Sequence, residues 1–226
     1  MSYAPAGIPN TAILSAAIVG LAMTLGLLLN RAGKRSEHQG ARQRATDLFQ
    51  LFHGRLAGSV PPRTLRLAVH ESTTDSYWDA IEAMVGTVRL SERYDLAREL
   101  AKNRHAALER RMLLREDDQT RREIAARRLG LLPSRRSRRV LRRALVRGPE
   151  GVRFAAARAL ATHRDRGALR WILEHPQAFG RRPIPALSGL LRGFGPASRA
   201  MLLLAIERGL EDAHTECALL DALGVS

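Results

Sequence analysis

Few residues of the chain have the types and the spacing that enzymatic chemistry requires. No two of the histidines lie three or four positions apart, so no helix can present a two-histidine edge to a metal ion. Cys217 is the only cysteine, which excludes an intrachain disulfide and a thiolate metal cluster. Because Cys217 stands in the apolar stretch Cys-Ala-Leu-Leu, we expect it to pack as a small hydrophobic residue. The histidines are His38, His53, His70, His105, His163, His175 and His214.

Two adjacent pairs carry groups that some enzymes use in catalysis. His70 precedes Glu71, and Trp78 precedes Asp79. A single pair of the first kind is more typical of a solvent-facing position, and one of the second kind is more typical of a helix start with a buried indole. The chain also has no Gly-rich phosphate loop and no nucleophile elbow. We therefore predict that the protein is not an enzyme, with no catalytic residue, no metal and no cofactor.

The densest group of charged residues is the segment Ser134–Arg147, SRRSRRVLRRALVR, in which seven of fourteen residues are arginine. At 100° per residue, Val140, Leu141, Ala144 and Leu145 share one side of a helix. The other side is the candidate basic interaction face, and its residues are Arg135, Arg138, Arg139, Arg142 and Arg143. Four interpretations stay open: a solvated surface, an acidic protein partner, anionic lipid headgroups, or nucleic acid.

The composition makes the whole chain basic without naming a partner. The net charge is +15, from 37 Lys+Arg against 22 Asp+Glu, and only Lys34 and Lys102 are lysines. Such a bias is typical of a GC-rich genome and weakens the idea that arginine was chosen for bidentate recognition. The charge still attracts polyanions. Aromatic residues make up only 4%, too few for the base-stacking platforms of single-strand binders.

The N-terminal segment predicts a membrane anchor. Ala12–Leu29, AILSAAIVGLAMTLGLLL, is uncharged, and as a helix it spans about 27 Å of the ~30 Å hydrocarbon core. Basic residues flank only its C-terminal side, which predicts an outside N-terminus and a cytoplasmic remainder. A cleaved signal peptide is the main alternative, but Met1–Asn10 carries no charged side chain and no small-x-small cleavage site is suitably placed. A buried core helix and a disordered tail fit the segment less well.

Small residues recur every four positions within this predicted anchor. Such spacing lines one face of a helix and lets a second membrane helix approach closely. Small residues are also simply common in membrane helices, so the pattern permits a homo-oligomer without requiring one. The predicted small-residue face consists of Ala12, Ala16, Gly20 and Thr24.

The remainder of the chain contains an internal repeat. Pairs of apolar residues recur at intervals of 31, 31 and 32 residues, and a second apolar helix is expected after each pair. Paired helices at a fixed period predict an α-solenoid, because one pair alone cannot bury its own face. The pairs are Ala125 and Leu129, Ala156 and Leu160, Leu187 and Leu191, and Leu219 and Leu223.

Two segments resemble bacterial HEAT repeats of the short type also found in phycobilisome-lyase-like proteins: LLREDDQTRREIAARRLGLLPSRRSRRVLRRAL and GPEGVRFAAARALATHRDRGALRWIL. The similar features are an acidic turn at Glu116–Asp118, arginines that open the next helix, and the AA-x-x-LG core. The resemblance covers about Ala106–Leu223. It implies an all-α fold in which a transmembrane helix precedes a right-handed solenoid of HEAT-type hairpins.

The predicted organisation has four parts. Residues 1–10 form a short extracytoplasmic N-terminus, 11–30 the transmembrane helix, 31–62 a basic juxtamembrane segment, and 63–226 the solenoid. The juxtamembrane segment contains a short amphipathic helix near Arg42–Leu56, which the breaker Gly58–Pro62 (GSVPP) ends. Beyond the breaker, Trp78, Ile81, Val85 and Val88 form one apolar stripe of a region that we expect to contain one or two divergent N-terminal repeats.

The HEAT resemblance implies a scaffold or adaptor more strongly than an enzyme. We expect a cytoplasmic surface at the inner membrane that binds membrane-associated protein partners, with a glycosyltransferase as one candidate by analogy. Anionic lipid headgroups are a second candidate, and the tether disfavours nucleic acid. Two alternatives come from relatives of this fold: a DNA glycosylase-like protein and a lyase-like protein that handles a cofactor. HEAT-like di-iron enzymes use several His-Glu pairs, whereas this chain has only His70-Glu71 in that order.

Overall fold

The computed structural model describes residues 40–88, 90–179, 182–209 and 213–224. The predicted anchor Ala12–Leu29, with its small-residue face of Ala12, Ala16, Gly20 and Thr24, lies outside this part of the chain. Among the helices that are described, none has both the length and the apolar character that crossing a bilayer requires. The described residues contain helices and no strand, which confirms the all-α prediction for them.

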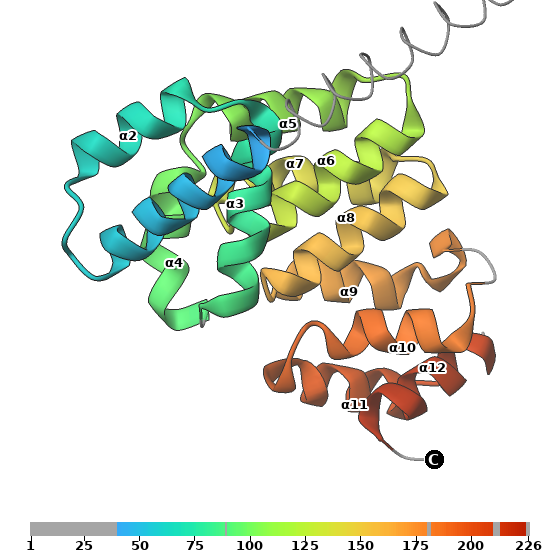
Figure 1. Cartoon of the computed structure of the whole chain (residues 1–226). Coiled ribbons are helices and arrows are strands. Elements are labelled where there is room, and N and C mark those ends of the chain that lie inside the picture. The colour runs from blue at the N-terminus through green and yellow to red at the C-terminus, as the bar shows by residue number, and fades with distance from the viewer. Residues whose placement is uncertain (1–39, 89, 180–181, 210–212, 225–226) are drawn as a thin grey trace, which may run out of the picture.

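The chain is helical from residue 40 to residue 56 and then forms a succession of short helices (Figure 1). The first group comprises α2 (Pro62–Glu71), α3 (Thr74–Thr87), α4 (Leu90–Leu100) and α5 (Arg104–Arg115). The second comprises α6 (Gln119–Leu131), α7 (Arg135–Arg147), α8 (Glu150–Thr162) and α9 (Arg166–Glu174). After a short 3₁₀ turn come α10 (Ile184–Arg192), α11 (Arg199–Glu207) and α12 (Ala213–Leu223).

Polar side chains in the turns set where several helices begin. The side chains of Thr73, Asn103, Asp118, Ser134 and Asp165 each accept a hydrogen bond from a backbone N–H in the first turn of the next helix. Each such cap stabilises its helix by about 1 kcal/mol, because one of the unpaired N–H groups gains an acceptor. The acidic turn recognised in the sequence therefore acts through Asp118, which caps α6.

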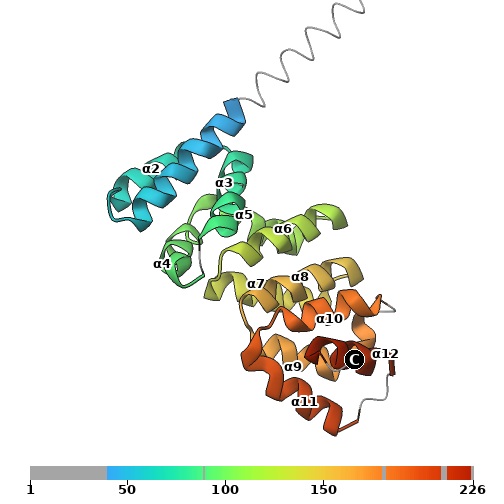
Figure 2. The same ribbon diagram turned by 60° about the horizontal axis from the view of Figure 1, so that its bottom comes forward.

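Alternate helices lie side by side, and the stack is extended along the chain. α6 packs along α8, α10 along α12, and α5 against α7, while Figure 2 shows the succession from residues 40–56 at one end to α11 and α12 at the other. α6 and α8 meet backbone to backbone at Gly130. A Cβ placed on Gly130 would lie 2.9 Å from both the Cα and the Cβ of Ala159, closer than side-chain atoms tolerate. Gly130 therefore permits a close contact between the two helices.

The repeat predicted from the sequence forms the core of the C-terminal half. All six residues predicted to be buried between stacked layers are no more than 7% exposed. They lie in one hydrophobic cluster with residues of α7, α9 and α12, so the predicted register is correct. The six are Ala125, Leu129, Ala156, Leu160, Leu187 and Leu191.

A second cluster forms the core of the N-terminal half. Phe52 and Leu48 bury their side chains in it together with Leu65, Trp78 and Ile81. The helix over residues 40–56 thus packs onto α2 and α3. The sequence-based boundary at residue 62 stays a prediction, but it divides helices that share one core.

One expectation about a side chain was wrong. Cys217 is exposed, because the buried stripe of α12 runs through Thr215, Ala218 and Leu219 and residue 217 lies on the far side of that helix. On α11, Leu203 is 45% exposed while its neighbour Leu202 is buried.

Candidate functional site: the arginine face

α7 has two sides of opposite character. Ser134 caps its N-terminus by accepting a hydrogen bond from the backbone N–H of Ser137. Leu141, Ala144 and Leu145 are buried, as the helical wheel predicted. Arg135, Arg139, Arg142 and Arg143 of the predicted basic face are exposed, and Arg138 is half-buried. Arg136 and Arg147 are exposed as well, although the prediction did not include them.

Arg142 differs from the other arginines of α7 because it forms a bidentate ion pair. Its Nε and Nη2 donate to the two carboxylate oxygens of Asp165, at 3.0 Å and 2.7 Å. The Asp165 side chain is fully buried and also accepts a hydrogen bond from the backbone N–H of Ala168, at the start of α9. Arg142 thus joins α7 to α9. We therefore interpret Arg142 as a structural residue, while its place in the predicted binding face stays a prediction.

The environment of Asp165 keeps its carboxyl group ionised. Burial by itself would raise the pKa of Asp165. The hydrogen bonds from Arg142 and Ala168, together with the charges of Arg142 and Arg138, outweigh the burial and hold that pKa below its usual value. The ion pair is therefore present throughout the neutral range.

The remaining exposed arginines of α7 have no acidic partner in the described part of the chain. No carboxylate there lies within 4.0 Å of their guanidinium nitrogens. The residues are Arg135, Arg136, Arg139, Arg143 and Arg147.

Neighbouring helices carry further exposed arginines. α5 packs against α7 and exposes Arg111 and Arg115, and α9, which Arg142 joins to α7, exposes Arg166 and Arg170. We call these arginines, together with the unpaired ones of α7, the arginine face. Its residues are Arg111, Arg115, Arg135, Arg136, Arg139, Arg143, Arg147, Arg166 and Arg170. Apolar side chains stand among them on α5 and α7: Leu108 is 44% exposed, Leu114 40% and Val146 49%.

The surface formed by α6 and α8 contains arginines of another kind. Arg128 donates to Glu109 at 2.8 Å, Arg127 lies 3.3 Å from Glu82, and Arg182, which comes after η1 (Pro176–Phe179), lies 3.0 Å from Glu150. A groove of about 870 Å³ runs along this surface. Its lining includes Gly130, Ala159, Ile124 and Phe154, so small residues form part of it and larger apolar ones border it.

Three of the four residues in the pairs that could have indicated catalysis are exposed. His70 and Glu71 are both exposed. Trp78 is buried in the N-terminal core while Asp79 is exposed, as the structural interpretation of that pair predicted. Within the described residues no group of three His, Cys, Asp or Glu side chains could hold a metal ion.

Two histidines have structural positions that the sequence did not reveal. His105 is buried and its ring contacts the Val69 carbonyl and the hydroxyls of Ser72 and Thr74. His163 lies at the end of α8, where its Nε2 is 3.1 Å from the Gly130 carbonyl of α6. Neither contact involves residues near in sequence, so no local pattern could have indicated them.

Comparison with protein-family models, curated proteins and solved structures gives no significant match. The function must therefore be inferred from the residues and the geometry of this chain.

Proposed function

We propose that this protein is a membrane-anchored scaffold that binds an acidic surface of a partner protein through the arginine face. The observation that carries the proposal is a contrast in pairing. The exposed arginines of α7 other than Arg142 have no carboxylate partner among the described residues, whereas Arg127, Arg128 and Arg182 on the α6–α8 surface each contact one. Unpaired guanidinium groups retain donors for a carboxylate, and Arg forms such contacts in bidentate geometry.

Apolar side chains within the face favour a protein over a lipid headgroup layer. Leu108, Leu114 and Val146 are each at least 40% exposed. Protein interfaces combine an apolar centre with arginine, whereas attraction to an anionic leaflet needs only the charge, at about 1 kcal/mol for each basic residue near the surface. The partner we propose therefore offers carboxylates around a small apolar patch.

The proposal also includes a HEAT-type solenoid and an N-terminal anchor. The all-α fold, the side-by-side packing of alternate helices and the buried repeat residues support the solenoid. The uncharged segment Ala12–Leu29 and its one-sided basic flank support a single-pass anchor with a cytoplasmic solenoid. Tethering would concentrate the arginine face near membrane-bound partners, and no catalytic step is required of the chain itself.

The test is a pull-down from mildly solubilised membranes, followed by mass spectrometry of the co-purifying proteins. One variant replaces Arg135, Arg139, Arg143 and Arg147 with Gln and keeps the Arg142–Asp165 pair. A matched control replaces four exposed arginines outside the face, Arg63, Arg98, Arg199 and Arg208, so that both variants lose equal charge. The face variant should lose the partner and the control should retain it. Equal loss in both variants would show that net charge alone causes the binding.

A nucleic-acid partner is the competing function, because a basic surface over three helices also attracts phosphates. Duplex DNA should bind at low salt and dissociate near physiological salt, since binding by charge alone is lost as counterions compete. Submicromolar DNA binding at physiological salt that the four substitutions abolish would replace the scaffold proposal with this one.

A further inference from the structure

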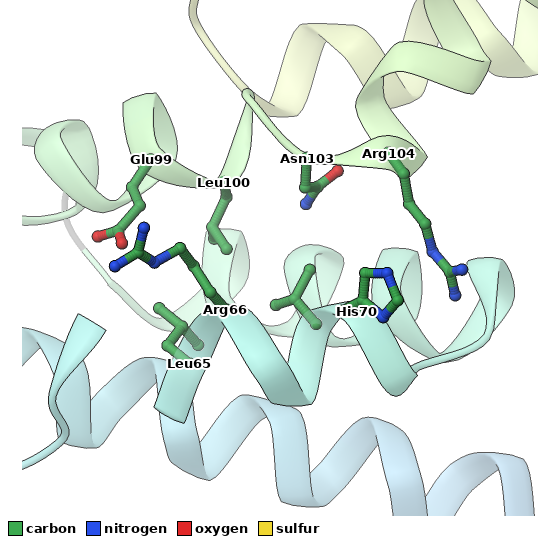
Figure 3. A pocket seen from close by; sticks show the side chains of 8 residues that line it. Leu65, Arg66, His70, Glu99, Leu100, Asn103 and Arg104 are labelled. Carbon is green, nitrogen blue, oxygen red and sulfur yellow. The ribbon is translucent and has the colours of Figure 1, made fainter. Parts of the chain in front are cut away.

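The cavity between α2 and the turn that joins α4 to α5 has a volume of about 140 Å³ and a mostly apolar lining, which includes Leu65, Val69 and Leu100. Figure 3 shows that the guanidinium groups of Arg66 and Arg104 point toward opposite ends of this cavity. One small ligand therefore cannot contact both of them, and we interpret the cavity as space left between packed helices. The outer side of α11, at the other end of the molecule, carries a more specific pattern.

α11 exposes apolar side chains at the end of the stack of helices. Seven of its nine residues, RAMLLLAIE, are apolar, but only Leu202 is buried. Leu203 and Leu204 are each 45% exposed. The helix packs against α12 and the 3₁₀ turn Pro196–Ser198, and Figure 2 shows no described helix beyond it. The outermost helices of a stacked repeat protein usually have a polar outer side, so an apolar outer side indicates a contact.

The exposed residues of α11 have the spacing of a helix-packing side. Ala200, Leu203, Leu204 and Glu207 stand at positions i, i+3, i+4 and i+7, and all four are exposed. Residues at these intervals lie on one side of a helix. A small residue next to two leucines allows the side chains of a second helix to interdigitate with them. The surface therefore fits another helix.

The charges at the two ends of α11 indicate which helix that is. Arg199 begins α11 and Glu207 ends it, and neither has an ion-pair partner among the described residues. Each charge opposes the macrodipole of its own helix, because the first turn favours acidic residues and the last turn favours basic ones. A second α11 in antiparallel orientation would bring Glu207 of each copy next to Arg199 of the other. A parallel orientation would instead place Glu207 against Glu207.

We propose that two copies of this chain associate through antiparallel α11 helices, with a two-fold axis between residues 203 and 204. Leu203 of each copy then packs against Leu204 of the other, and an Arg199–Glu207 ion pair forms at both ends, as an isologous contact requires. The contact is separate from the small-residue face predicted for the anchor and from the arginine face, which has no residue on α11. One short helix from each copy buries less area than stable complexes do, so we expect a dissociation constant on the order of 10 µM.

Energy transfer between full-length chains in detergent micelles measures this association. Cys217 is the only cysteine and is exposed on α12, so it accepts a donor dye in one preparation and an acceptor dye in another. Empty micelles in excess over the chains prevent transfer by chance occupancy of one micelle. We expect transfer that saturates with protein concentration. No concentration-dependent transfer up to about 100 µM would overturn the proposal.

Two charge reversals test the antiparallel pairing, because they should rescue each other. Glu207→Arg or Arg199→Glu alone sets like charges together at both ends of the dimer and should weaken association by about tenfold or more. A mixture of the two variants restores opposite charges at both ends, so the mixed dimer should form with nearly the original affinity. Glu71→Arg is the matched control, because Glu71 is also an exposed glutamate at the last position of its helix, α2. It should leave association unchanged.

Two outcomes of the variant series contradict the proposal. Association that neither reversal weakens would place the contact outside α11, and weakening that the mixture does not restore would exclude the antiparallel pairing. The arginine-face variant of the pull-down keeps α11 intact and should dimerise like the original chain. The pull-down control lacks Arg199 and Arg208 and should dimerise less, so its retention of the partner would show that partner binding does not require the dimer.

Discussion

The arginines of the α6–α8 surface and those of α7 are the same side chain in two different roles. On α6, Arg128 lies against the buried Glu109 and Arg127 lies against Glu82. On α7, the described residues supply a carboxylate only to Arg142. Arginine content alone therefore does not identify a binding surface, and the position of each carboxylate partner must be known.

The first way to test this difference is to remove the most deeply paired arginine. Arg128→Ala should lower the free energy of unfolding by about 3 to 5 kcal/mol, because it leaves the fully buried Glu109 carboxylate without its partner. Arg127→Ala is the matched control on the same helix. Its pair with Glu82 is exposed on both sides, so its loss should cost at most about 1 kcal/mol. Urea unfolding monitored by circular dichroism gives both values.

The double variant Arg128→Ala/Glu109→Gln separates the charge from the packing. It should recover part of the lost stability, because no unpaired charge then stays buried. If Arg128→Ala alone costs less than about 1 kcal/mol, the distinction between structural and free arginines fails at its strongest example.

The second test uses His163, which lies at the end of α8 and contacts the Gly130 carbonyl of α6. Burial lowers its pKa to about 4, aided by the charge of Arg138 on α7 and opposed by the hydrogen bond to Gly130 on α6. The unfolded chain therefore binds a proton near pH 6.5 that the folded chain binds only near pH 4. The contribution of neutral His163 to stability is fully present above about pH 6.5. The free energy of unfolding should fall by roughly 1 to 3 kcal/mol as the pH decreases toward about 4.

The free energy of unfolding, measured at about pH 7.5 and at about pH 4.5, gives this pH dependence. His163→Gln keeps a donor for the Gly130 carbonyl but cannot titrate, so the variant should lose less stability than the original chain over that interval. The pKa of His105 is also lowered by burial, so some acid sensitivity should persist. Equal pH dependence in both chains would mean that His163 titrates normally in the folded state.

The third test compares two neighbours on α7. Arg142→Gln should cost about 1 to 2 kcal/mol, since the Asp165 carboxylate is buried but the arginine side chain itself is 55% exposed and solvent can partly replace it. Arg143→Gln changes an exposed side chain without a carboxylate partner among the described residues and should stay within about 0.5 kcal/mol. Thermal unfolding of the two single variants is sufficient, and equal effects would mean that the bidentate pair contributes nothing.

Local sequence patterns predicted the helices and their buried sides but not the contacts between distant segments. The 31-residue spacing identified Leu129 and Leu160 as core residues, because a repeated apolar position is visible in the sequence before the packing of the helices is known. The pairing of Arg142 with Asp165 depends on how α7 lies against α9. The cavity near Asn103 likewise requires α2 to meet the turn after α4. Neither leaves a periodic signal in the sequence.

The smallest expected effect is the most informative about α7. Arg135, Arg139, Arg143 and Arg147 are each four residues apart, so they form three like-charged pairs along one exposed side of the helix. Each such pair destabilises a helix by about 0.2 to 0.5 kcal/mol, and Arg147 alone gains from its position at the C-terminal end. Replacing all four with Gln should therefore leave the free energy of unfolding unchanged or raise it by up to about 1 kcal/mol. The gain should shrink as salt is added, because salt screens the repulsion between exposed charges.

Together with loss of the partner in the pull-down, such a result would mean that α7 carries charges that oppose its own folding and favour binding. A decrease in stability of more than about 1 kcal/mol, by contrast, would show that these arginines make contacts the folded chain needs, and the arginine face would then be structural like the α6–α8 surface.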